Sequence, residues 1–166
     1  AFFLRVLDRV QGEFLTGIEV LPVDALIDFN LAPLSTRRDI SMFGLMHRAT
    51  LGLAPPQFNK FFHPARPGAN IRGWAYSFRR HSKQLHDPID GSTTRMMERS
   101  VLGLIYSYNS LPQHIVDHIS VRTFQRSLQN AVKKCARSGA QNWEALLRQG
   151  ARANGITSFT HWFRAG

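Results

Sequence analysis

The feature that most constrains the fold is the helical spacing of apolar residues between Ser120 and Arg137. Along this segment the apolar side chains recur at intervals that keep them on one face of an α-helix. They are Val121, Phe124, Leu128, Ala131, Val132 and Cys135. Ser120 is a favourable N-cap residue, so the sequence predicts a long amphipathic helix that begins just after it and ends near Arg137.

A second stripe on this predicted helix is basic. Spacings of four, three, four and four place five polar side chains on one line: Arg122, Arg126, Gln129, Lys133 and Arg137. No acidic residue interrupts this helix. We therefore expect one face to be buried in a core and the other to be strongly cationic.

Residues 36–51 predict another helix, which is mostly apolar but keeps one polar edge. Ser35 or Thr36 offers an N-cap, and Thr36 with Asp39 has the spacing of a capping box. The polar edge consists of Arg37, Ser41, Gly44 and Arg48. A glycine inside a helix costs about 1 kcal/mol relative to alanine, so Gly44 indicates close approach by another group. The edge fits contact with a polyanion, and equally a solvated helix face.

The adjacent arginines at the start of this helix are expected to differ in role. The helical wheel places Arg37 on the polar edge and Arg38 toward the apolar flank. We therefore predict a phosphate contact for Arg37. For Arg38 we predict a pair with an acid near Asp39 or packing of its aliphatic stem.

The rest of the chain also favours helices. Shorter helices are expected over residues 2–15, after Pro22, over 95–108, after Pro112 and within 141–149. Residues 63–95 are interrupted by Pro and Gly, and the alternating aromatics of 74–78 fit either a strand with a basic edge or a loop. The expected fold is mainly α: an irregular helical bundle with a loop-rich or short-stranded segment near 63–95.

The distribution of charge indicates the partner. The chain carries +10, and its 21 cations comprise 17 Arg and 4 Lys. Residues 1–39 hold four bases and six acids (−2), whereas residues 40–166 hold 17 bases and five acids (+12). Arginine suits bidentate contact with phosphate, and two long acid-free basic segments favour nucleic acid as the leading partner.

The sequence lacks the motifs of an enzyme. It has no adjacent carboxylates, no glycine-rich phosphate loop with a lysine, no G-x-S-x-G and no H-E-x-x-H. His114, His118 and Cys135 suggest a zinc site only weakly, and we interpret Cys135 as a core residue. We expect no catalytic residue, metal or cofactor in this chain, no membrane span, and an intracellular location in nucleus or cytoplasm. Because its first methionine is Met42, we also expect it to be a piece of a longer polypeptide.

Four ordered motifs resemble one family. They are LDRVQGEFL (7–15), NLAPLSTRRDISMFGLMHRATLGLAPPQFNKFF (30–62), YNSLPQHIVDHIS (108–120) and SVRTFQRSLQ (120–129). Together they are similar to the segment that follows the polymerase core in reverse transcriptases of non-LTR (long interspersed) retrotransposons. Tyr108 stands where that family usually has Trp, and Gly12 stands where a basic residue is common.

The resemblance implies a thumb and C-terminal region that holds template and primer, in a transposable element whose parent protein is an RNA-directed DNA polymerase. The catalytic aspartates of the palm would then lie upstream, outside this chain. Residues 1–137 would form the thumb-like helical region, with the loop-rich insert 63–95, and residues 138–166 a C-terminal extension with a short helix.

The predicted function is therefore non-catalytic binding of RNA or DNA backbone, with the upstream polymerase core as a second partner. The candidate binding residues are Arg37, Arg48, Arg79, Arg80, Lys83, Arg122, Arg126, Lys133 and Arg137. The alternative is a helical scaffold that docks on protein without touching nucleic acid. Exposed apolar side chains within residues 2–14 and 156–163 would favour that alternative.

Overall fold

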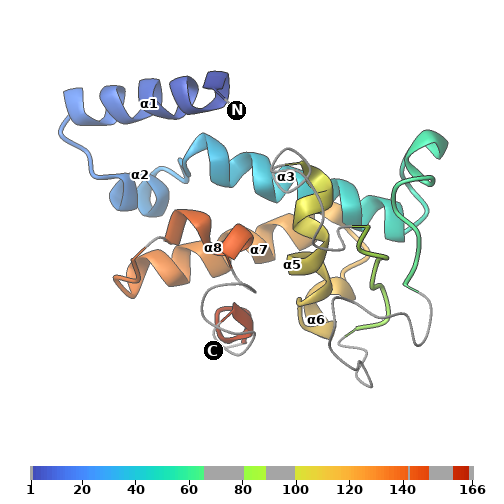
Figure 1. The fold of residues 1–166 in the computed structure, drawn as a ribbon. Coiled ribbons are helices and arrows are strands. Elements are labelled where there is room, and N and C mark those ends of the chain that lie inside the picture. Colours follow the sequence, from blue (N-terminus) through green and yellow to red (C-terminus); the bar gives the residue numbers. More distant parts are fainter. Residues whose placement is uncertain (1, 66–80, 89–99, 142, 150–158, 165–166) are drawn as a thin grey trace.

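The computed structural model describes residues 2–65, 81–88, 100–141, 143–149 and 159–164 (Figure 1). Within these ranges the chain is mainly helical, which confirms the expected fold class. No strand forms in the described ranges, where the β-type pairing is an isolated antiparallel bridge between Pro64 and Leu85. The alternating aromatics of 74–78 lie outside the described residues.

The helices of the described ranges vary from single turns to 17 residues. In chain order they are α1 (Phe2–Gly17), α2 (Pro22–Asp28), α3 (Leu34–Thr50), η1 (Pro56–Phe58), η2 (Val101–Leu104), α5 (Ile105–Asn109), α6 (Gln113–Val116), α7 (Val121–Arg137), η3 (Trp143–Ala145) and α8 (Leu146–Gln149). Of the helix predicted over 95–108, residues 95–99 lie outside the described ranges. The remainder is a 3-10 turn followed by a short α-helix.

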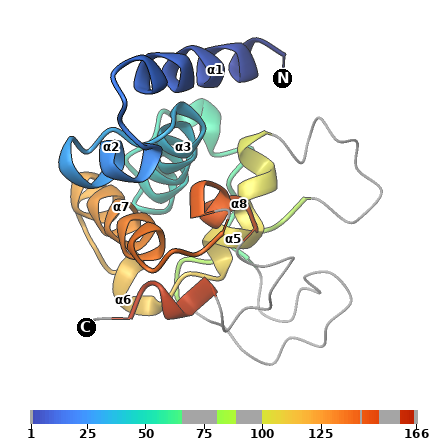
Figure 2. The ribbon, with the colours of Figure 1, turned by 90° about the vertical axis from the view of Figure 1, so that its left-hand side faces the viewer.

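The two longest internal helices, α3 and α7, form the centre of the molecule. They run antiparallel side by side, while α1 lies along one edge, above α2 and α3 (Figures 1 and 2). The ring of His47, late in α3, stacks on the ring of Phe124, early in α7, with centroids 4.0 Å apart. Phe43 and Leu128 are fully buried in the same core. The apolar faces predicted for both helices are therefore the faces that pack.

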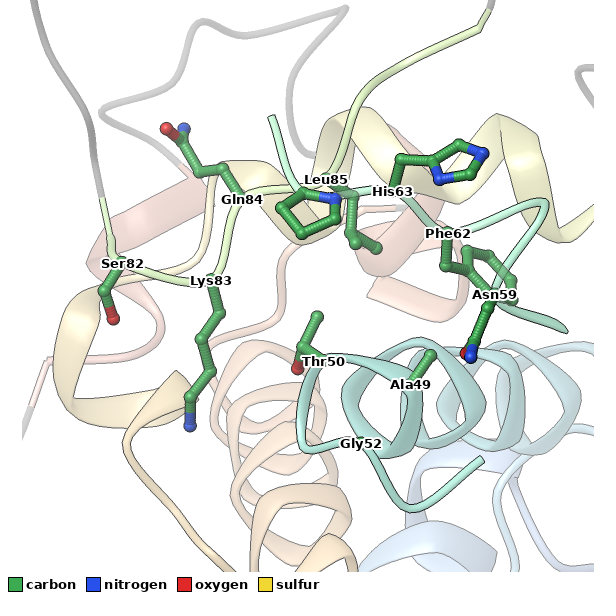
Figure 3. A pocket seen from close by; sticks show the side chains of 11 residues that line it. Ala49, Thr50, Gly52, Asn59, Phe62, His63, Ser82, Lys83, Gln84 and Leu85 are labelled. Atoms are coloured by element: carbon green, nitrogen blue, oxygen red, sulfur yellow. The ribbon is translucent and has the colours of Figure 1, made fainter. Parts of the chain in front are cut away.

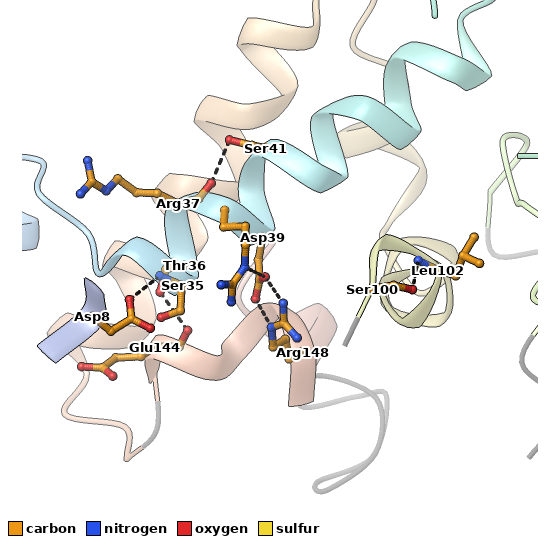
Figure 4. Close-up of polar contacts among 11 residues, drawn as sticks. Asp8, Ser35, Thr36, Arg37, Asp39, Ser41, Ser100, Leu102, Glu144 and Arg148 are labelled. Atoms are coloured by element: carbon orange, nitrogen blue, oxygen red, sulfur yellow. Dashed lines mark hydrogen bonds and ion pairs between the residues drawn. The ribbon is translucent and has the colours of Figure 1, made fainter. Parts of the chain in front are cut away.

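The caps of these two helices differ in how well sequence predicts them. Ser120 caps α7 as expected, because its hydroxyl accepts from the Thr123 N–H. At α3 the predicted Ser or Thr cap is wrong. The N-cap position is Pro33, and the Ser35 N–H donates instead to Asp8 of α1, at 3.0 Å (Figure 4).

The predicted capping box at Thr36 and Asp39 is also wrong. The Thr36 hydroxyl donates to the Glu144 carbonyl at 2.9 Å, and Asp39 accepts two hydrogen bonds from the Arg148 guanidinium (Figure 4). Both side chains are buried, so contacts with residues more than 100 positions away replace local capping.

The segment after α7 packs into the same core. Trp143 and Leu147 are buried, as are Phe159 and Phe163 beyond the next undescribed stretch. These two phenylalanines therefore pack back onto the core and are not the exposed side chains that would favour the docking alternative. Their rings lie 5.0 Å apart, and the Phe163 carbonyl lies 2.8 Å from His114 Nε2.

Candidate nucleic-acid interface

The basic edges of α3 and α7 meet at a tight crossing. A Cβ placed on Gly44 would overlap the side-chain amide of Gln125, so a larger residue here would require the flexible end of the Gln125 side chain to move. The Gln125 amide also donates to the Ile40 carbonyl at 3.4 Å. The close approach that a mid-helix glycine predicts is thus present, and the approaching group is a side chain of this chain.

Helical geometry places both basic edges on the same side of this crossing. In two antiparallel helices that face each other at Gly44 and Gln125, residues rotated in the same sense from those points project to one common side. Ser41 and Arg48 lie there on α3, and Arg122 and Arg126 lie there on α7; all four side chains are exposed. We call these four residues the α3–α7 seam.

No negative charge opposes the seam from its own helices. α7 contains no acid, and the one acid of α3, Asp39, is 2% exposed and bound by Arg148. Arg38 Nε also lies 3.8 Å from Asp39, so Arg38 pairs with an acid as expected, although with its immediate neighbour. The seam is therefore a cationic surface rather than a set of ion pairs.

Three of the predicted arginines, one in the seam and two outside it, are exposed. Arg48 is exposed and uses Nε to donate to the Leu53 carbonyl at 2.9 Å. Arg37 is exposed and lies 3.3 Å from the Gln11 amide oxygen of α1. Its side chain points away from the Asp39–Arg148 pair (Figure 4). Arg137 is exposed at the far end of α7.

Two predicted lysines have structural partners. Lys83 is half-buried and donates to the Val116 carbonyl at 2.6 Å, whereas Lys133 donates to the Ile27 carbonyl at 3.4 Å. Each carbonyl belongs to the last turn of a helix, where a cation is favourable. These lysines stabilise α6 and α2, and their contact with phosphate stays a prediction. Arg79 and Arg80 lie outside the described residues.

A pocket of about 440 Å³ lies beyond the C-terminal end of α3 (Figure 3). Its lining includes Ala49, Thr50, Phe62, Lys83 and Leu85. Two of its polar groups are engaged: the Thr50 hydroxyl donates to the His47 carbonyl, and Lys83 binds Val116. We therefore assign it no chemistry.

A buried polar cluster fixes the core side of α3. His47 Nε2 lies 2.7 Å from the His118 carbonyl, and its Nδ1 lies 3.2 Å from the Tyr108 hydroxyl. His81 Nε2 lies 3.0 Å from the Tyr108 carbonyl. Burial lowers the pKa of His47, lowers that of His81 to about 4, and raises that of Tyr108 to about 12. These groups are neutral at physiological pH and serve packing.

The residues of the weak zinc motif are dispersed. His114 faces the Phe163 carbonyl, His118 Nε2 lies 3.0 Å from the Ser127 hydroxyl, and Cys135 is buried, which raises the pKa of its thiol. In the part of the chain that the structure describes, no three His, Cys, Asp or Glu side chains gather as metal ligands would.

Sequence reasoning missed Gln125 as the residue that joins the two basic edges. The available signal was Gly44 itself, since a glycine inside a helix can indicate a close neighbour, but it does not say which residue that neighbour is, and Gly12 inside α1 has none within 4 Å. Comparison with protein-family models, with curated proteins and with solved structures found no match. None of the described helices combines the length and apolar character needed to span a membrane.

Proposed function

We propose that this chain is a non-catalytic nucleic-acid-binding region that holds a phosphate backbone along the α3–α7 seam. The observation that carries the proposal is the exposure of Arg48, Arg122 and Arg126 on one side of a crossing whose helices offer no free acid. Backbone contacts of this kind position a strand without reading its sequence. The resemblance to retrotransposon reverse transcriptases supports template and primer as the ligand.

The seam accounts for fewer phosphate contacts than the sequence suggests. With Lys83 and Lys133 engaged in the fold, three arginines remain in the seam itself. Counterion release for three neutralised phosphates gives a slope of log affinity against log salt of roughly −3 for duplex DNA, and about −2 for a single strand. For a ligand of known form, the slope therefore reports the number of contacts.

The test compares two triple variants that remove equal charge. The first variant removes the three positive charges of the seam: Arg48→Gln, Arg122→Gln and Arg126→Gln. The second removes three exposed cations elsewhere: Arg9→Gln, Lys60→Gln and Arg164→Gln. We expect the first set to weaken binding of a labelled 20-mer by 10-fold or more at low salt and to flatten the salt slope. Fluorescence anisotropy with RNA, DNA and a hybrid measures both quantities. Equal losses in both variants, or no binding by the parent chain, contradict the proposal.

A second candidate function is a docking scaffold that contacts protein only. It is favoured by α1, where Leu7, Val10 and Phe14 are more than half exposed. The resemblance would make an upstream polymerase core of the same polypeptide the partner. Size-exclusion chromatography of a longer chain that includes this core tests the idea, since docking predicts a monomer in which Phe14 is protected from solvent. The nucleic-acid-binding function would operate in nucleus or cytoplasm.

A further inference from the structure

The outer face of α1 is a continuous apolar surface. Val6 is 40% exposed, and Leu7, Val10, Phe14 and Ile18 are 51%, 56%, 60% and 51% exposed. The last four follow one another at spacings of three, four and four, so they form one stripe along the helix and just past its end. Isolated exposed apolar residues are ordinary, but a contiguous stripe of this kind marks an interaction surface.

This stripe takes no part in holding α1 on the protein. Other side chains do that: the Asp8 carboxylate accepts from the Ser35 N–H, the Gln11 amide donates to the Ala32 carbonyl at 3.2 Å, and Leu15 is buried. α1 is therefore ordered before any partner arrives. Binding of a partner would therefore not include the entropic cost of forming the helix. A smaller buried interface area is then enough for binding.

The charges around the stripe exclude a polyanion as its occupant. The described side chains of residues 6–28 include five acids (Asp8, Glu13, Glu19, Asp24 and Asp28) and one base, Arg9, and the exposed Arg37 also contacts α1 through Gln11, which gives 2 − 5 = −3. The whole chain carries +10. This acidic end repels a nucleic acid. In a twofold pair its acids also face like charges, so pairing is favoured at salt concentrations that screen them and where Arg9 of each copy reaches Glu13 of the other.

We propose that the stripe pairs with the same stripe of a second copy, in an antiparallel arrangement about a twofold axis. An axis beside Val10 places Val10 near its symmetry mate and Leu7 opposite Phe14 of the second copy, because these two lie at nearly equal distances from Val10 along the helix. On one flank, Glu13 of each copy comes level with Arg9 of the other, to within one residue. Both the apolar and the charged positions are thus self-complementary.

The size of the stripe predicts a weak dimer. The five side chains expose on the order of 400 Å² per copy, which is within the range of the largest patches on monomers. Pairing would then bury roughly 800 Å² in total, or somewhat more with flanking groups, which belongs to the class of small, transient interfaces. We expect dissociation constants in the micromolar range.

Sedimentation equilibrium of the nuclease-treated 166-residue chain, at 1–100 μM and about 0.5 M salt, tests the proposal. We expect a monomer–dimer equilibrium that Val10→Glu and Phe14→Glu each weaken at least 10-fold. Ile119→Glu and Leu53→Glu are matched controls, since these side chains are 86% and 57% exposed elsewhere on the protein, and they should dimerise like the parent chain. Circular dichroism checks that each variant is folded.

A charge-swap series tests the antiparallel register. Arg9→Glu and Glu13→Arg should each weaken the dimer, and the double variant should restore it. The seam triple variant should dimerise normally, which separates this proposal from nucleic-acid binding. A chain that stays monomeric at 100 μM leaves the stripe to a different protein and overturns the proposal. So does a dimer that Val10→Glu and Phe14→Glu leave intact.

Discussion

Helices α1 and α7 have nearly the same sequence pattern and opposite environments. They are 16 and 17 residues long, and each places apolar residues at intervals of three and four. In α7 the apolar face is buried, with Phe124 and Leu128 fully inaccessible, whereas Val10 and Phe14 of α1 are more than half exposed. Amphipathic spacing therefore predicts that a face will be covered, but the covering surface need not belong to the same chain.

The difference arises from what each helix has to pack against. α7 lies antiparallel to α3, whose own apolar face offers Phe43 and His47 to it. α1 crosses the start of α3, where it is held through Asp8, Gln11 and the buried Leu15. The apolar stripe of α1 is left facing outward because the docking contacts use a different side of the helix.

The largest expected difference in the free energy of unfolding is between truncation of one buried phenylalanine, Phe124, and of one exposed phenylalanine, Phe14. Phe124→Ala should lower the free energy of unfolding by about 3–5 kcal/mol, because it opens a cavity beside His47. Phe14→Ala should change it by less than about 0.5 kcal/mol, since the side chain is 60% exposed. Urea titrations at about 1 μM protein, where association is minor, measure both values.

If Phe124→Ala does not fold, Phe124→Leu provides the same comparison at smaller amplitude, with a loss of about 1.5 kcal/mol or less. Equal losses at positions 14 and 124 would mean that the α1 stripe is covered within the monomer, and the distinction between the two helices would fail.

Acid pH should lower the stability of the fold through the buried histidines of the core rather than through the α1 stripe. His81 is buried and neutral, and burial lowers its pKa from 6.5 to about 4. The unfolded chain binds the proton more readily, so this stabilisation is complete above pH 6.5 and is lost progressively as the pH falls toward 4. The full effect is about 3 kcal/mol, and the lowered pKa of His47 adds to it in the same direction.

The measurement is the free energy of unfolding from pH 7.5 to 4.5. His81→Gln should be less stable than the parent chain at pH 7 but should show a flatter decline below pH 6.5. His86→Gln is the matched control because His86 is exposed, and its decline should parallel that of the parent. Parallel declines in both variants would show that His81 does not carry the pH dependence.

Much of the helical framework could be predicted from sequence, because spacing and capping are local. The bounds of α7, its Ser120 cap and its buried face follow from residues a few positions apart, and so does the need for a close neighbour at Gly44. The Asp39–Arg148 pair could not be predicted, since it joins residues 109 positions apart. The hydrogen-bond partners of Lys83 and Lys133 also could not be predicted, because helical spacing does not show which carbonyl lies near an ammonium group.

The smallest of the expected effects concerns how α1 is held. Asp8 supplies the side-chain oxygen that the start of α3 lacks, because Pro33 at the N-cap has no side-chain acceptor and the Ser35 N–H donates to the Asp8 carboxylate at 3.0 Å. A negative charge at this end of α3 is also favourable to the helix dipole. Asp8→Ala should therefore lower the free energy of unfolding by about 1 kcal/mol, the usual value of an N-cap contact.

Glu13→Ala removes an exposed acid from the same helix and should cost much less, so the pair isolates the contact from the charge. Hydrogen exchange sharpens the result: in Asp8→Ala the amides of α1 and of the first turn of α3 should exchange faster, while those of α7 should not change. Faster exchange throughout α7 would show that α1 is an integral part of the core. In that case its outward stripe could not be explained by polar docking at the edge of the molecule.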